Sequence, residues 1–274
     1  MENTISKLTL VSVILKEAWI KYKRRFKDLV WIVLPSALFS VVGDYLIRLG
    51  GVAVTVGWIV TVLGIVAAIL STIALVYAVR NDKQFDESYD YAFKNLFHYL
   101  WIVFLVSIIS LGGMFLGIIP AFIFSIWFGL VCYIFVSEGD RGLGALLKSK
   151  EYVRGYFWPI VLRLIVIMFI SLAVSVMAGI LGAIIGSYIG FAITGIVSQL
   201  IIAPFLTVYL YSIYQDLARV KPELQGKKID KNRKFFALVG IFGVVITLII
   251  VTLLCVKYGV YGFINLLNYY FLNK

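Results

Sequence analysis

Seven apolar stretches, each close to the length of a membrane-crossing helix, occupy most of the 274-residue chain. A helix needs about 20 mostly apolar residues to cross the ~30 Å hydrocarbon core of a bilayer. Hydrophobic residues make up 62% of the chain and charged residues only 14%, which excludes an ordinary soluble protein. We therefore expect an all-α integral membrane protein with about seven transmembrane helices. The stretches are residues 29–49, 52–79, 99–119, 120–136, 157–180, 191–214 and 235–257.

The lysines and arginines fall almost entirely on alternate links between these stretches. If the N-terminus is cytoplasmic, 21 of the 25 basic residues lie on the inner side. By the positive-inside rule, this predicts a multi-pass protein of the plasma (inner) membrane with its C-terminus outside. The net charge of +11 is then an orientation signal, and we expect no nucleic-acid partner because the charges are spread over segments that adjoin lipid.

Three times, a polar segment of helical length leads into a pair of apolar stretches. Residues 17–33 align without a gap with residues 87–103, whereas residues 143–161 follow the same plan in a shifted register. A threefold repeat and a coincidence of apolar composition both stay open. We expect residues 1–220 to form a six-span domain of three interfacial helices and three helical hairpins. Residues 221–274 then add a basic linker, an extra span and a short outer tail.

The polar segments have the periodicity of amphipathic helices that lie in the headgroup layer. In the first segment the apolar stripe consists of Val11, Leu15, Ala18, Tyr22 and Phe26. In the second it consists of Phe85, Tyr89, Ala92, Phe93 and Leu96. The third segment, around residues 143–153, is less regular.

Five basic residues near the end of the first segment are candidates for contact with lipid headgroups: Lys21, Lys23, Arg24, Arg25 and Lys27. Near an anionic surface each contributes about 1 kcal/mol of attraction. The same charges also account for the orientation of the first span, so both interpretations stay open. The expected partners are membrane lipids, anionic ones above all, and a protein partner within the membrane is left open.

Polar residues within the spans are few, and such residues are costly enough to suggest function. Asp44 and Arg48 lie one helical turn apart, which favours a local ion pair over a substrate contact. Arg163 is close enough to the start of its span to extend toward the surface. Gln199 is typical of an interhelical hydrogen bond, with ion binding as the alternative.

Two regions of the chain allow more than one backbone arrangement. Gly182, Gly186 and Gly190 form a doubled GxxxG pattern, which suits either close helix packing or a loop around residues 181–190. Residues 99–136 allow two short spans or a re-entrant hairpin, because Gly112, Gly113 and Pro120 lie near the middle.

No residue pattern indicates catalysis. The single histidine, His98, has no neighbouring carboxylate or second metal ligand in the sequence. Cys132 and Cys255 both fall within apolar stretches. We expect no enzyme activity, no metal and no cofactor.

Three groups of residues resemble the glycerophosphodiester phosphodiesterase membrane-domain family and its relatives of unknown function. They are Glu17-Ala18-Trp19 with Tyr22 and Phe26; Glu138-Gly139, Gly142-Leu143, Ala145-Leu146, Ser149, Gly155 and Phe157-Trp158; and Ala203-Pro204-Phe205, Val208, Leu210-Tyr211, Tyr214 and Asp216-Leu217. The resemblance covers about residues 10–220 and implies a six-span membrane domain. In some relatives a soluble phosphodiesterase barrel supplies the catalytic residues. That barrel is absent here, so the activity is not implied, and the seventh span departs from the pattern.

The sequence predicts a non-catalytic scaffold or accessory protein at the cytoplasmic lipid surface. The alternative is a transporter or channel for a small or lipidic substrate, with Arg163, Gln199 and the glycine-rich spans along its pathway. A polar cavity reaching the bilayer midplane would favour transport. Lipid grooves beside the basic helices would favour the scaffold.

Overall fold

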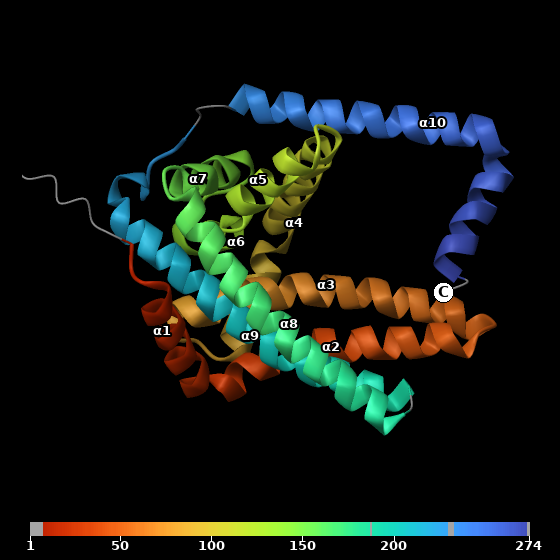
Figure 1. Cartoon of the computed structure of the whole chain (residues 1–274), viewed down its shortest axis with the longest axis horizontal. Coiled ribbons are helices and arrows are strands. Elements are labelled where there is room, and N and C mark those ends of the chain that lie inside the picture. The colour runs from red at the N-terminus through yellow and green to blue at the C-terminus, as the bar shows by residue number, and fades with distance from the viewer. Residues whose placement is uncertain (1–7, 187, 230–232, 273–274) are drawn as a thin grey trace, which may run out of the picture.

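The computed structural model describes residues 8–186, 188–229 and 233–272, and 89% of it is helical. No strand occurs among these residues, which confirms the all-α class. The helices are α1 (Val11–Arg24), α2 (Phe26–Leu49), α3 (Val52–Asn81), α4 (Phe85–Phe115), α5 (Ile118–Phe128), α6 (Val131–Glu138), α7 (Leu143–Val153), α8 (Phe157–Ile185), α9 (Tyr188–Val220), the 3-10 turn η1 (Pro222–Leu224) and α10 (Arg233–Leu272) (Figure 1).

Seven described segments are long and apolar enough to cross a membrane, in agreement with the seven stretches of the sequence. They are α2, α3, α4, the α5 and α6 pair (Ile118–Glu138), α8, α9 from Thr194 and α10 as far as Lys257. Their outward faces are apolar: on α8, Leu162, Phe169 and Ile180 are each more than half exposed. Such a surface requires lipid around it, because water would penalise so large an apolar area.

The second polar segment does not form a helix of its own. Residues 85–98 are the first half of α4, which continues without a break to Phe115. By contrast, Arg25 separates α1 from α2, and residues 154–156 separate α7 from α8. The interfacial helix expected before the third span is therefore continuous with that span.

Each polar helical segment packs on the hairpin of another unit, so the three units form a closed ring. In α1, the Tyr22 hydroxyl donates to the carbonyl of Ile201 on α9, at 3.4 Å. In α4, the Tyr89 hydroxyl donates to the carbonyl of Ile32 on α2, at 2.8 Å. In α7, the Ser149 hydroxyl donates to the carbonyl of Trp127 on α5. This arrangement fits three related units and closes the first unit on the third.

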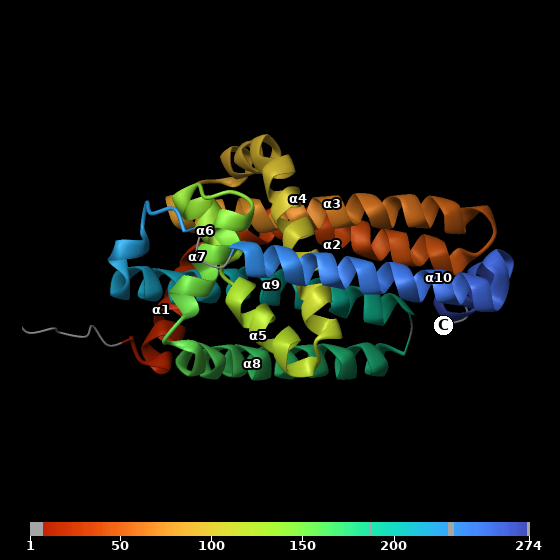
Figure 2. The same ribbon diagram turned by 90° about the horizontal axis from the view of Figure 1, so that it is seen from above.

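One end of the bundle, here called the polar end, contains α1, α7 and the links 82–84, 139–142 and 221–229 (Figure 1). The α2–α3 and α8–α9 turns lie far from it along the long axis. The α4–α5 turn lies only part of the way along that axis in both views (Figures 1 and 2). Both segments are long enough to span, so two short spans and a re-entrant hairpin both stay open for residues 99–136.

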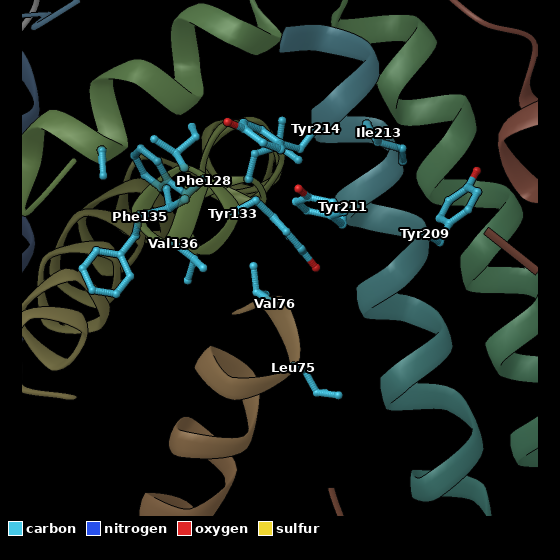
Figure 3. Close-up of a cluster of buried hydrophobic side chains, with 14 of the residues drawn as sticks. Leu75, Val76, Phe128, Tyr133, Phe135, Val136, Tyr209, Tyr211, Ile213 and Tyr214 are labelled. Atoms are coloured by element: carbon cyan, nitrogen blue, oxygen red, sulfur yellow. The ribbon is translucent and has the colours of Figure 1, made fainter. Parts of the chain in front are cut away.

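The core of the polar end forms where α3, α6 and α9 approach one another. Val76 of α3, Tyr133 of α6 and Tyr211 of α9 are buried there (Figure 3). The rings of Tyr133 and Tyr211 lie 6.3 Å apart. These three helices are the last helices of the three hairpins, so the core joins all three units.

Glycines allow the closest helix contacts, mainly at positions outside the doubled GxxxG pattern. In the α2–α3 hairpin, a Cβ atom on Gly57 would lie 2.8 Å from the Ile47 backbone nitrogen. Between α4 and α10, a Cβ atom on Gly112 would lie 2.1 Å from the Val239 carbonyl oxygen. Contacts this short exclude any side chain at either position.

The doubled GxxxG pattern forms the end of a hairpin. Gly182 is within α8, Gly186 ends that helix with a positive φ of 70°, and Gly190 is within α9. A Cβ atom on Gly190 would meet the Gly182 carbonyl oxygen at 3.1 Å. The pattern thus combines both alternatives, a helix–helix contact and a turn.

Candidate functional site at the polar end

An apolar groove, here called the α1 groove, lies between α1, α8 and α9. Its volume is about 530 Å³. One face of α1 forms a wall through Ser12, Leu15, Lys16, Trp19 and Tyr22. The facing walls include Val174 of α8 and Phe205 of α9. The lining is almost wholly apolar, and Lys16 is the one charged residue along it.

The position of α1 follows from its apolar stripe. Ala18 and Tyr22 are buried against protein, and the Tyr22 ring packs edge-on against Phe205. We expected this stripe to face lipid, but the side of the helix with Ala18 and Tyr22 docks on α9. Trp19 lies beside it, 45% exposed, where it contacts Phe205 and extends the groove. Val11 and Leu15 are half-buried, and Phe26 is exposed beyond the end of α1.

The five predicted headgroup residues do not form one continuous lipid-facing patch. Lys21 donates to the Gln215 side chain at 3.1 Å, and the Lys23 ammonium lies 5.0 Å from the centre of the Trp19 ring. Arg24 pairs loosely with Asp82, at 3.8 Å. Lys27 is exposed.

Arg25 turns into the protein instead. Its guanidinium donates to the carbonyl oxygens of Ala78 and Lys83 and pairs with Asp82 at 3.2 Å. Arg25 therefore connects the α1–α2 junction to the end of α3. Its side chain is only 10% exposed, in keeping with this structural role.

Arg163 is 1% exposed and belongs to a buried ion pair. Its Nη2 lies 2.8 Å from Asp216 Oδ2 and donates to the Thr9 carbonyl oxygen at 2.6 Å. Asp216 also accepts from the Thr9 hydroxyl at 2.7 Å and pairs with Arg219 at 2.5 Å. This network ties the segment before α1 to α8 and α9 and so closes the ring of units.

A second buried network surrounds Lys148 of α7. Its ammonium lies 2.6 Å from Glu138 Oε2 and 2.5 Å from Asp140 Oδ2. Glu138 Oε1 accepts from the hydroxyls of Tyr152 and Tyr214, both at 2.8 Å. Burial lowers the pKa of Lys148, but hydrogen bonds and charge from Asp140 and Glu138 outweigh it and leave the pKa above its ordinary value. Lys148 thus stays charged and holds the α6–α7 link.

The remaining intramembrane candidates are not brought together. Asp44 and Arg48 are exposed near the end of α2 that lies away from the polar end (Figure 1). Gln199 is half-buried on α9. Arg163 thus makes its contacts at the polar end without Asp44 or Arg48.

Within the described residues, no group of three His, Cys, Asp or Glu side chains could hold a metal ion. His98 Nε2 lies 2.9 Å from Arg141 Nη1. Cys132 and Cys255 carry free thiols. The buried charged side chains of Arg163, Asp216, Lys148 and Glu138 form ion pairs that connect helices.

Sequence reasoning missed the partners of the buried charges. Asp216 and Lys148 were assigned no role as site residues, because both belong to segments that look like the polar ends of helices. Thr9 and Asp216 are 207 residues apart, so no local spacing could reveal their contact. The only local sign of a buried ion pair was Arg163, an arginine within an apolar stretch.

Comparison with known proteins adds no relative. No protein-family model, no curated protein and no solved structure matches the chain significantly. The resemblance to the phosphodiesterase membrane-domain family therefore stays a prediction.

Proposed function

We propose that this chain is a non-catalytic membrane protein that binds an anionic lipid at its polar end, in a scaffold or accessory role. The observation that carries the proposal is the α1 groove. It is apolar along its length, opens between membrane-facing helices and has Lys16 on its α1 wall. A lipid chain would lie in the groove, and its headgroup would meet Lys16.

The physical basis of selectivity is the headgroup and not the lipid tail. The bilayer interior is as apolar as the groove, so moving a tail from one to the other yields little free energy. A lysine near an anionic headgroup contributes about 1 kcal/mol. Lys23, which lies over the Trp19 ring at the same helix, adds a second positive charge near the groove.

We further propose the orientation that the charge asymmetry predicts. The polar end then lies on the cytoplasmic side of the plasma membrane, with the C-terminus outside. This orientation is the same whether residues 99–136 form a re-entrant hairpin or two complete spans. In both cases the chain enters and leaves the membrane on the cytoplasmic side. Two further predictions from the sequence belong to this proposal. They are the resemblance to the glycerophosphodiester phosphodiesterase membrane-domain family and the division of the chain into residues 1–220 and 221–274.

The alternative role as a transporter gains no support from Arg163. Its Nη2 atom is held by Asp216 and Thr9 at the polar end. The Asp216 carboxylate balances the buried charge of Arg163 within the protein, while the Nη1 atom is buried without a hydrogen-bond partner. We therefore rank the lipid-binding role first.

The test is lipid retention by the full-length protein in native mass spectrometry, with phosphatidylglycerol and phosphatidylcholine in equal amounts. We expect the wild type to retain phosphatidylglycerol preferentially. Lys16→Gln should reduce that preference by about fivefold, the equivalent of about 1 kcal/mol. Lys94→Gln, which removes an exposed charge on α4, is the matched control and should leave the preference intact. Equal retention of the two lipids by the wild type would refute the proposal.

A further inference from the structure

A second cavity at the polar end, here called the α7 pocket, is chemically different from the α1 groove. It has a volume of about 430 Å³ and lies between the link before α7, the first turns of α7, residues 228–229 and the start of α10. Three basic side chains line it: Arg141, Lys228 and Arg233. Neither the orientation signal nor the lipid proposal accounts for their convergence on one cavity.

The one acidic residue in the lining, Asp140, is partly neutralised from behind and faces three basic residues. It pairs at 2.5 Å with the buried ammonium of Lys148, which Glu138 shares at 2.6 Å. Arg141 contacts a ring nitrogen of His98, which carries no negative charge. The pocket therefore presents a net positive lining.

The N-terminus of α7 adds to the positive potential of the pocket. Leu143 and Gly144, the first two residues of the helix, line the pocket. The preceding residue, Gly142, provides no side-chain cap, and no acidic residue occupies the first turn. Backbone N–H groups at such a terminus attract anions, and phosphate groups above all. A Cβ atom on Gly144 would meet nothing within 4 Å, so the space beside this turn is open.

We infer that the α7 pocket binds a phosphate group, either as free phosphate or as the headgroup of a phosphate-monoester lipid. Arg141 and Lys228 provide charge-assisted hydrogen bonds, and the α7 terminus provides backbone donors. The site does not depend on the α1 groove, since the two cavities share no lining residue.

The experiment has two arms, both with the full-length protein. In the first, inorganic phosphate is titrated calorimetrically at constant ionic strength, with chloride as the reference anion. In the second, the protein in phosphatidylcholine nanodiscs receives phosphatidic acid or diacylglycerol, which lacks the phosphate, and bound lipid is measured by mass spectrometry. Arg141→Gln and Lys228→Gln should each weaken binding about tenfold. Gly144→Leu should block the pocket without changing its charge.

Lys227→Gln is the matched control, because Lys227 is exposed and next in sequence but does not line the pocket. Thermal unfolding without phosphate verifies that each variant is folded. Binding in the first arm identifies free phosphate as the source, and binding in the second arm alone identifies the lipid. The inference is overturned if neither ligand binds, or if Arg141→Gln, Lys228→Gln and Gly144→Leu all bind as the wild type does. Loss of lipid selectivity in Lys16→Gln has no bearing on this result.

Discussion

Two buried basic residues, Arg163 and Lys148, form the ion pairs of the polar end, but only one of them is conspicuous in the sequence. Arg163 is conspicuous in the sequence because an arginine interrupts an apolar stretch. Lys148 is not, because it lies in a polar segment where lysines are common. In the structure both are about 1% exposed and both are paired with carboxylates. Each therefore connects segments that are distant along the chain.

The first prediction concerns the Arg163–Asp216 pair. Asp216→Ala leaves the Arg163 guanidinium buried without its carboxylate and removes the acceptor for Thr9. Loss of one partner of a buried pair costs about 3–5 kcal/mol. Thermal unfolding of the purified protein should show a large destabilisation. Glu17→Ala, at an exposed position on α1, should change the stability by no more than about 0.5 kcal/mol. Similar stabilities of the two variants would contradict the structural role.

At the scale of helices, the sequence predicted the seven spans because their length and hydropathy are local properties. For residues 181–190 it left close helix packing and a loop both open, and the structure ends α8 at Gly186 within that range. It did not predict that α4 is continuous or that the side of α1 with Ala18 and Tyr22 packs on α9. Those outcomes depend on which surface of another helix is available, and an apolar stripe is equally compatible with lipid and with protein.

The second prediction tests the contact between α4 and α10. Gly112→Ala places a methyl group where the Val239 carbonyl oxygen lies, and a backbone atom cannot move aside cheaply. We expect α10 to separate from α4 and the unfolding temperature to fall by several degrees, as a loss of about 1–3 kcal/mol implies. Gly179→Ala on α8, whose new methyl group would meet nothing within 4 Å, is the control. An unchanged unfolding temperature for Gly112→Ala would show that this contact does not hold α10.

At the scale of the whole molecule, the partial repeat suggests three similar units but does not predict that they close into a ring. Closure requires Thr9 to reach Asp216, and a single sequence contains no record of that pairing. The candidate site was likewise predictable only in part. The basic helix α1 was identified, whereas the α1 groove depends on side chains from three helices.

The third prediction is the topology. In a background without Cys132 and Cys255, single cysteines at positions 50, 82, 118, 140 and 228 are treated with an impermeant reagent in intact cells. Position 50 should react, whereas 82, 140 and 228 should not, because their segments carry the inner-side charge. Position 118 should be protected if the α4–α5 hairpin is re-entrant. Reaction at 228 would reverse the orientation, and reaction at 118 would establish two full spans.

The most direct test of lipid binding is photocrosslinking of the full-length protein in nanodiscs with an anionic lipid that carries a diazirine in its tail. We predict that crosslinks concentrate on residues 12–22, 170–174 and 201–205, the three walls of the α1 groove. Excess phosphatidylglycerol should compete with this labelling, and phosphatidylcholine should not. Labelling spread evenly over the exposed faces of α3, α8 and α10, with no enrichment at the groove, would contradict lipid binding at this site.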